Sequence, residues 1–168
     1  MSDLRHPDLA ADLIATLTER GLTVAVAESL TGGLLVAELI RPAGASAVVR
    51  GGIVAYSTEL KASLLGVDSS VLAVHGPVHP DVARQMAAGV RAALTVGGLP
   101  ADIGIATTGV AGPDPQGGQP VGTVFVAIAI GIEIHVLELA LEGDREAIRS
   151  AVVYESLVEL TRLLAPSE

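Results

Sequence analysis

The sequence predicts an α/β protein, a three-layer α/β/α sandwich whose mixed, largely parallel sheet includes a C-terminal antiparallel hairpin. Two observations lead to this fold class. Short apolar runs alternate with segments of helical periodicity, in the order αβαβααβββα. Half of the 168 residues are hydrophobic, but one Phe, two Tyr and no Trp are among them, so Ala, Val, Leu and Ile must form the core. A chain of this length is about one domain in size, and we expect a single domain over residues 1–168.

The N-terminal third is predicted to run helix, strand, helix, strand. Apolar residues recur at helical spacing over residues 8–20, between a proline and a glycine. Residues 22–27 are a short apolar run that leads through a tight turn into a helix over residues 34–40. Residues 48–55 are predicted to form the second strand, and the glycine pair inside it suggests a bulge or a close backbone approach.

The middle of the chain is predicted to supply two helical segments and the third strand. A short helical piece covers residues 56–66, and residues 79–94 form a helix with its apolar residues on one face. Residues 101–106 read as a strand, and residues 107–120 as a long loop because Gly and Pro are frequent there.

The C-terminal part is predicted to be a hairpin followed by a long helix. Residues 121–130 and 133–141 are apolar strands separated by so little sequence that only an antiparallel hairpin can join them. Residues 144–164 carry apolar residues at helical spacing. In sheets of this kind ligands bind beyond the carboxyl ends of the strands, so the loops after the first three strands should form the site.

Composition and charge exclude several classes of function. Ten Lys and Arg oppose nineteen Asp and Glu, a formal charge of −9, and the basic residues are scattered, so we expect no nucleic-acid partner. No apolar run reaches the ~18 residues that span a bilayer, and the N-terminus lacks an apolar signal region, so we expect a soluble cytoplasmic protein without a membrane partner. The absence of cysteine excludes disulfides, zinc-thiolate sites and a cysteine nucleophile.

Ser29 is the first candidate for chemistry because it ends a strand and precedes a glycine-led turn and helix. Its hydroxyl and the first N–H groups of that helix could point at one ligand atom, supplying a nucleophile and an oxyanion or phosphate site. Thr31, Gly32 and Gly33 are therefore candidate substrate-binding residues. The alternative is that Ser29 or Thr31 only caps the helix. We expect the neighbouring Glu28 to orient the turn or a pocket group, and its spacing assigns it no catalytic step.

No histidine is an obvious base for Ser29, so the sequence offers no strong Ser-His-Asp triad. His75 and His79 flank a loop that contains proline, and a metal site there lacks a third ligand nearby. His135 lies inside a predicted strand, and His6 lies in the leading segment. We expect no metal site.

Lys61 is the other possible base, because its short helix leaves the second strand much as the turn at Ser29 leaves the first. A lysine held near apolar walls can lose its proton near neutral pH and activate a serine. Lys61 is the only lysine beside nine arginines, which suggests a position that needs an amine able to deprotonate. The alternative is a solvated surface lysine.

Other residues near these loops are open to two interpretations. Tyr56 could stack on a planar ring or bond to the Ser29 and Lys61 pair, or it could be a half-buried core tyrosine. Thr108 and Gly109 follow the third strand, where small residues allow a ligand close to the backbone, although an ordinary turn uses the same residues.

Arg145 begins the last helix, just after Asp144, a plausible N-cap. A cation is unfavourable at a helix N-terminus unless it serves an anionic ligand. The structural alternative is an ion pair with Glu142 or Glu146.

Five motifs together closely resemble the CinA C-terminal domain family, whose active members are nicotinamide-nucleotide amidases. They are AESLTGG (27–33), RGGIVAYSTELKASLLGV (50–67), TTGVAGP (107–113), PVGTVF (120–125) and GDREAIR (143–149). The likeness runs in order through nearly the whole chain, in what looks like the free-standing form of the domain. It departs mildly at Val110, where the family usually has Ile, and at Gln119, where a lysine is frequent.

The resemblance implies hydrolysis of the carboxamide of nicotinamide mononucleotide to nicotinate mononucleotide and ammonia, with no cofactor and no metal. Ser29 would match the nucleophile, Lys61 the general base and Tyr56 their partner. Thr108 and the glycines beside it would line the substrate pocket, and Arg145 would bind an anionic group. The competing interpretations are a non-catalytic nucleotide-binding module and an interaction domain. An aliphatic-rich chain of this size could also pair with a second copy, so we expect a homo-oligomer.

Overall fold

The computed structural model describes residues 8–166, in which helices and strands alternate along the chain. His6 lies outside the described residues. The elements are α1 (Leu9–Arg20), β1 (Val24–Glu28), α2 (Leu34–Ile40), the 3-10 helix η1 (Ala45–Ala47), β2 (Val49–Val54), α3 (Thr58–Leu65), α4 (Ser69–His75), α5 (Pro80–Ala93), β3 (Ile103–Gly109), β4 (Thr123–Ile130), β5 (Glu133–Ala140) and α6 (Arg145–Leu164).

The predicted elements are present, with two differences that concern the site. Helix α4 was not expected, because its seven residues carry no buried side chain and so no periodic pattern. Strand β3 continues through Gly109, three residues into the segment predicted as loop, because Thr107, Thr108 and Gly109 pair with strand β4.

The strands form one mixed sheet in the order β2-β1-β3-β4-β5. Strand β1 is parallel to β2 and to β3, whereas β4 is antiparallel to β3 and to β5, so β4 and β5 form the predicted hairpin. The bulge suggested by the glycine pair is present: Val24 pairs with Val49, but the next residue of β1 pairs with Gly51. Gly51 has a φ of +146°, a conformation that L side chains rarely adopt.

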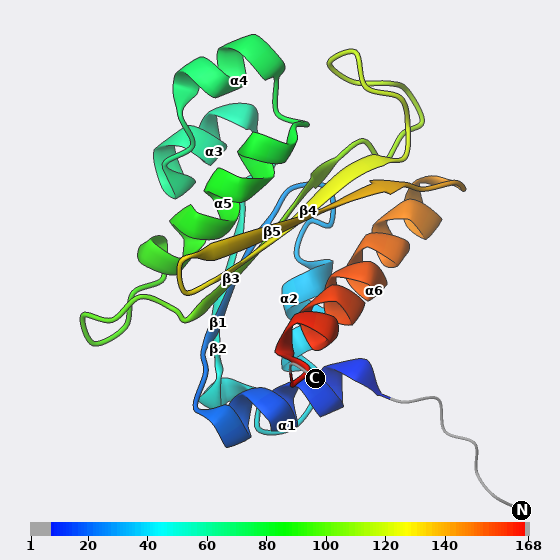
Figure 1. The fold of residues 1–168 in the computed structure, drawn as a ribbon. Coiled ribbons are helices and arrows are strands. Elements are labelled where there is room, and N and C mark those ends of the chain that lie inside the picture. The colour runs from blue at the N-terminus through cyan, green and yellow to red at the C-terminus, as the bar shows by residue number, and fades with distance from the viewer. Residues whose placement is uncertain (1–7, 167–168) are drawn as a thin grey trace, which may run out of the picture.

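Helices cover both faces of the sheet, so the predicted three-layer sandwich is confirmed (Figure 1). Side chains alternate along β1: Val24 and Val26 pack toward α1, α2 and α6, while Ala25 and Ala27 pack toward α5. The alanine face lets α5 approach closely. A Cβ at Gly104 of β3 would lie 2.0 Å from the carbonyl oxygen of Ala87 in α5, so only glycine fits there.

The sheet brings three chain segments to one edge. Glu28, the last residue of β1, pairs with Val54 at the end of β2 and with Thr107 near the end of β3. Because these strands are parallel, the segments that follow β1 and β2 emerge beside the last residues of β3. This edge positions the site described below.

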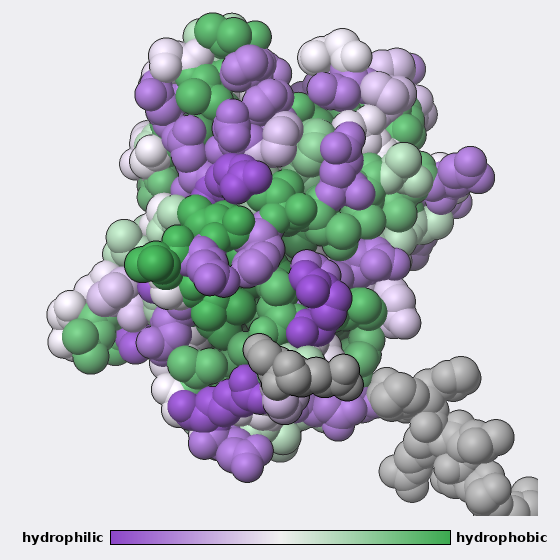
Figure 2. Space-filling model, viewed as in Figure 1, coloured by the Kyte–Doolittle hydropathy of each residue, from purple (hydrophilic) through white to green (hydrophobic). Residues whose placement is uncertain are grey.

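The molecular surface mixes hydrophilic and hydrophobic residues on the face shown in Figure 2. Several large apolar side chains are exposed, among them Ile40, Val54 and Leu64. Among residues 8–166, no helix combines the length and the apolar character that crossing a membrane requires.

Candidate active site

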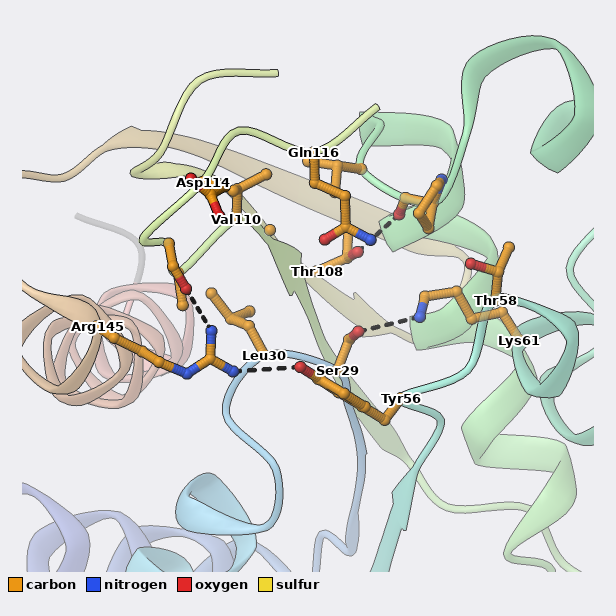
Figure 3. A pocket seen from close by; sticks show the side chains of 15 residues that line it. Ser29, Leu30, Tyr56, Thr58, Lys61, Thr108, Val110, Asp114, Gln116 and Arg145 are labelled. Atoms are coloured by element: carbon orange, nitrogen blue, oxygen red, sulfur yellow. Dashed lines mark hydrogen bonds between the residues drawn. The ribbon is translucent and has the colours of Figure 1, made fainter. Parts of the chain in front are cut away.

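A pocket opens at the carboxyl edge of β1, β2 and β3, bounded by the first turn of α6 and by the segment after α4 (Figure 3). It collects residues that are far apart in the sequence. Its lining consists of Ser29, Leu30, Tyr56, Thr58, Lys61, Pro77, Val78, Thr108, Gly109, Val110, Ala111, Gly112, Asp114, Gln116 and Arg145.

Ser29 is held at the base of this pocket by the sheet. It directly follows β1, and its backbone N–H donates to the carbonyl oxygen of Thr107 at 3.1 Å, so the strand pairing continues one residue into the turn. Its side chain is nearly buried, with 8% exposure. The Oγ atom accepts a hydrogen bond from Lys61 Nζ at 3.0 Å.

Lys61 reaches Ser29 from α3 and is 1% exposed, which is unusual for a lysine. Its Nζ also donates to the carbonyl oxygen of Ala55 at 2.7 Å. Burial removes water from the ammonium and lowers the pKa of Lys61 from 10.5 to about 8. The alternative interpretation of Lys61 as a solvated surface lysine is therefore wrong.

We call Ser29 and Lys61 the inner pair. A neutral lysine amine has two hydrogens and one lone pair. With one hydrogen on the Ala55 carbonyl oxygen, the amine can accept the hydroxyl proton of Ser29 without moving its partners. A pKa of about 8 leaves about a tenth of the molecules in this neutral form at pH 7. The arrangement can therefore act as a nucleophile and its general base.

Tyr56 and Arg145, which we call the outer pair, lie on the open side of the pocket. Arg145 Nη2 donates to the Tyr56 hydroxyl oxygen at 3.2 Å, and Nη1 donates to the carbonyl oxygen of Gly112 at 2.6 Å. Tyr56 is 62% exposed. The Tyr56 hydroxyl contacts Arg145 and not the inner pair (Figure 3). The resemblance had instead implied that Tyr56 is the partner of Ser29 and Lys61.

Arg145 follows Asp144, which caps α6 by accepting from the N–H of Ala147 at 2.9 Å. The guanidinium turns into the pocket and bonds Gly112 and Tyr56, and it does not pair with the neighbouring Glu142 or Glu146. The cation at this helix N-terminus thus faces the pocket, where an anionic ligand group could meet it.

Thr108 and Gly109 lie at the end of β3 and line the pocket, as predicted. The hydroxyl of Thr108 donates to the carbonyl oxygen of Pro77 at 2.7 Å and so ties the segment after α4 to the sheet. A Cβ at Gly109 would lie 2.7 Å from the carbonyl oxygen of Thr123, so β4 requires a glycine here.

Thr31, Gly32 and Gly33 do not line the pocket, in contrast to the sequence prediction. Thr31 is buried, and its hydroxyl bonds the Thr107 hydroxyl at 2.8 Å instead of capping α2. Gly32 and Gly33 have φ values of +58° and +101°, which turn the chain into the helix. These residues shape the turn behind Ser29.

Glu28 has a structural role, as expected, but its partners are the first N–H groups of α2, which the sequence did not reveal. Its fully buried carboxylate accepts from the N–H groups of Leu35 at 2.8 Å and Val36 at 3.2 Å. It therefore occupies donors at the start of α2 that we had expected to face the ligand.

Two other backbone donors take the place of these helix N–H groups. The N–H groups of Leu30 and Thr31, directly after Ser29, have no acceptor among residues 8–166. The turn is closed by the N–H of Gly32, which donates to the carbonyl oxygen of Ser29 at 3.2 Å. The unpaired N–H groups that follow Ser29 most closely in the sequence thus belong to the turn and not to α2.

Arg149 was not predicted, although it lies four residues after Arg145 and so on the same side of α6. Its Nε donates to the carbonyl oxygen of Leu30 at 2.8 Å, and its Nη2 donates to that of Thr31 at 3.2 Å. The helix is thereby fastened to the turn that carries Ser29. Other pocket residues on loops or helix ends also gave no sequence signal, among them Thr58, Asp114 and Gln116.

His75, His79 and His135 do not line the pocket. The rings of His75 and His79 stack with centroids 4.0 Å apart, and His79 Nδ1 accepts from the N–H of Asp81, capping α5. His135 on β5 faces Glu133. Among residues 8–166, no group of three or more His, Asp and Glu side chains is arranged to hold a metal ion.

Known proteins resemble this chain along nearly its whole length. The family model described as "CinA C-terminal domain" matches residues 6–164. A CinA-like protein of Frankia casuarinae is 48% identical over 153 residues, which are 91% of this chain and 34% of that protein. A putative competence-damage inducible protein of a Geobacillus species is 46% identical over 157 residues, 92% of this chain and 36% of that one. The chain thus spans about a third of the length of these curated relatives.

Solved structures share the fold. A competence/damage inducible protein of Agrobacterium tumefaciens superposes with a TM-score of 0.87 at 36% identity, covering 98% of this chain and all of that one. A competence damage-inducible protein of Klebsiella pneumoniae superposes with a TM-score of 0.88 at 34% identity, covering 96% of this chain and 98% of the other. Similarity of this extent and level establishes common ancestry.

Proposed function

The chain belongs to the CinA C-terminal domain family, and from this premise we propose that it is an amidohydrolase that converts nicotinamide mononucleotide to nicotinate mononucleotide and ammonia. The observation that carries the proposal is the 3.0 Å hydrogen bond between Ser29 Oγ and the buried amine of Lys61. A binding module has no need of a buried lysine with a lowered pKa against a serine hydroxyl.

In the proposed reaction, neutral Lys61 takes the proton of Ser29 as Oγ attacks the carboxamide carbon. The carbonyl π electrons move to oxygen, and the free N–H groups of Leu30 and Thr31 hold the oxyanion. When the oxyanion collapses, the C–N bond breaks, and Lys61 returns its proton to the nitrogen, which leaves as ammonia. The product of this half-reaction is an ester of Ser29.

Water completes the cycle by the same route. Lys61 accepts a proton from water as the oxygen attacks the ester carbon, and the proton passes to Ser29 Oγ as the ester bond breaks. The nicotinate mononucleotide formed as a carboxylic acid loses its remaining proton to solvent and leaves as the carboxylate. Lys61 carries the proton that is transferred in each half-reaction, so the proposed chemistry needs no cofactor.

The outer pair supports the proposal of a nucleotide as the substrate. The guanidinium of Arg145 faces the pocket, and a phosphate can accept two parallel hydrogen bonds from such a group. The ring of Tyr56 is exposed enough to stack on a planar heterocycle. A small nucleotide is therefore the proposed partner, and the predictions of a cytoplasmic protein and of a homo-oligomer stay predictions.

The test is to incubate the purified protein with nicotinamide mononucleotide and to measure ammonia. We expect release by the wild type and none by Ser29→Ala or Lys61→Met, with nucleotide binding retained in both variants. The competing function, a nucleotide-binding module without turnover, predicts binding but no ammonia from the wild type. Release that persists in Ser29→Ala would overturn the assignment of the nucleophile.

A further inference from the structure

The turn after Ser29 is fastened by a cation that the proposed reaction does not use. Arg149, one helical turn after Arg145 on α6, donates to the carbonyl oxygens of Leu30 and Thr31 at 2.8 and 3.2 Å. These two carbonyls belong to consecutive peptide units directly behind the pocket-lining Leu30. The side chain of Arg149 is absent from the pocket lining and is engaged with these two backbone carbonyls instead.

A planar trans peptide fixes the direction of its N–H once its carbonyl is held, because the two groups point in opposite directions. The carbonyl of Leu30 shares a peptide unit with the N–H of Thr31, and the carbonyl of Ser29 shares one with the N–H of Leu30. Arg149 holds the first carbonyl, and the N–H of Gly32 holds the second. The two N–H groups that lack an acceptor are thus the opposite ends of two anchored peptide units.

We infer that Arg149 is a positioning residue, which aims the N–H groups of Leu30 and Thr31 at the oxyanion that forms on the group attacked by Ser29. The role rests on the proposed function for the identity of the substrate, but not for the geometry. The guanidinium also polarises the peptide unit that it binds, which strengthens the N–H of Thr31 as a donor. Donors held in place before the reaction stabilise the transition state without rearrangement.

The test compares Arg149→Met and Arg149→Lys with a matched control, Arg91→Met. Arg91 makes the same kind of contact elsewhere: its Nε donates to the carbonyl oxygen of Ala101 at 2.8 Å and its Nη1 to that of Gly131 at 2.6 Å. These carbonyls lie at the amino end of β3 and just after β4, at the sheet edge opposite the pocket. Thermal unfolding of each variant shows whether it is folded.

Two measurements separate an effect on the positioning of the oxyanion donors from an effect on the turnover of one particular substrate. The first is kcat and KM for ammonia release from nicotinamide mononucleotide. The second is the rate at which a fluorophosphonate labels Ser29, followed by intact-protein mass. In that reaction Oγ bonds to phosphorus, fluoride leaves, and Lys61 takes the proton, so the rate depends on the same oxyanion donors.

We expect Arg149→Met to lower kcat and the labelling rate by about 10- to 100-fold, with KM within about twofold of the wild type. Arg149→Lys should recover part of the loss, since an ammonium can hold one carbonyl but not fork across both. Arg91→Met should keep both rates within about twofold. The midpoint of the labelling rate against pH should stay near that of the wild type in Arg149→Met, because Lys61 is untouched.

Specific results would overturn the inference. The inference is wrong if folded Arg149→Met is labelled and turns over at the rates of the wild type. It is also wrong if the pH midpoint of Arg149→Met is shifted, because that would show that the substitution disturbs Ser29 and Lys61 themselves. Equal losses of both rates in Arg91→Met would show that Arg149 acts only through the stability of the fold. A wild type that labels but releases no ammonia would refute the proposed substrate and leave the inference standing, whereas a wild type that does not label would refute the oxyanion role.

Discussion

Two hydrogen-bonded pairs of polar side chains line the same pocket, and they differ in their access to water. The inner pair is nearly buried, with Ser29 at 8% and Lys61 at 1% exposure, and its lysine has a lowered pKa. The outer pair is open to solvent, with Tyr56 at 62% exposure. Both pairs lie at the carboxyl ends of the parallel strands, on loops and on helices α3 and α6, so the pairs differ in how deeply they are buried and not in their place in the fold.

Depth decides what each pair can do. Removing water destabilises the charged form of Lys61, so its amine can act as a base near neutral pH. Water around the outer pair screens its charge, so the bond between Arg145 and Tyr56 is weak enough to be exchanged for a bond to a ligand. The pocket thus separates proton transfer at its base from anion binding at its mouth, and substitutions in the two pairs should affect different kinetic parameters.

The largest effect is expected from removing the inner pair. Ser29→Ala, Lys61→Met and Lys61→Arg should each lower kcat for ammonia release by roughly a thousandfold or more, because the nucleophile or its base is lost. Lys61→Arg is the most direct test of the base among the three substitutions, since arginine keeps the positive charge but cannot deprotonate. Initial rates with nicotinamide mononucleotide measure the loss.

The control for this prediction is nucleotide binding, which should persist in Ser29→Ala because the outer pair is intact. If Lys61→Arg kept a tenth or more of the activity of the wild type, the charge of Lys61 and not its basicity would matter. The assignment of proton transfer to the inner pair would then be wrong.

The second effect is a pH dependence that belongs to the inner pair. Only neutral Lys61 can accept the serine proton, and its pKa is lowered to about 8, so kcat/KM should rise with pH and level off above about pH 8. The expected rise is about tenfold between pH 7 and pH 9, a range in which the substrate phosphate (second pKa about 6) stays doubly ionised. A profile that is flat or falls across this range would show that Lys61 does not act as the base.

The third effect concerns the outer pair and should appear in KM. Arg145→Gln removes the cation at the mouth of the pocket and should raise KM for nicotinamide mononucleotide by about 10- to 100-fold, with kcat changed much less. Nicotinamide riboside, which lacks the phosphate, provides the control. If Arg145 binds the phosphate, the substitution should leave the KM for the riboside nearly unchanged, whereas an equal rise for both substrates would assign Arg145 to another group.

The sequence predicted the strands and the inner pair because both depend on local signals. The apolar run before Ser29, the turn glycines after it and the isolated lysine mark the ends of two parallel strands, and parallel strands bring such ends together. The depth of Lys61 could not be predicted, because its burial results from packing among the pocket segments, including α3 and the end of β2.

Long-range contacts account for most of what the sequence did not reveal. Glu28 caps a helix that begins six residues later, a spacing that no local capping pattern contains. Arg149 bonds a turn almost 120 residues earlier in the chain, so periodicity could place it on α6 but could not identify its partner. Helix α4 was missed because none of its residues is buried.

The smallest expected effect tests to which pair Tyr56 belongs. Its hydroxyl bonds exposed Arg145 at 3.2 Å, so Tyr56→Phe removes a single solvent-screened hydrogen bond and should change KM by about two- to fivefold, with kcat and the pH profile kept. In an Arg145→Gln background the same substitution should have almost no effect, because the bond it removes is already gone. Rates of the two single variants and the double variant measure this coupling. If Tyr56 instead assists the inner pair, as the family resemblance implied, Tyr56→Phe would lower kcat by about a hundredfold and shift the pH midpoint in either background. That result would place the tyrosine in the proton transfer despite its exposure, and the boundary between the two pairs would no longer coincide with depth.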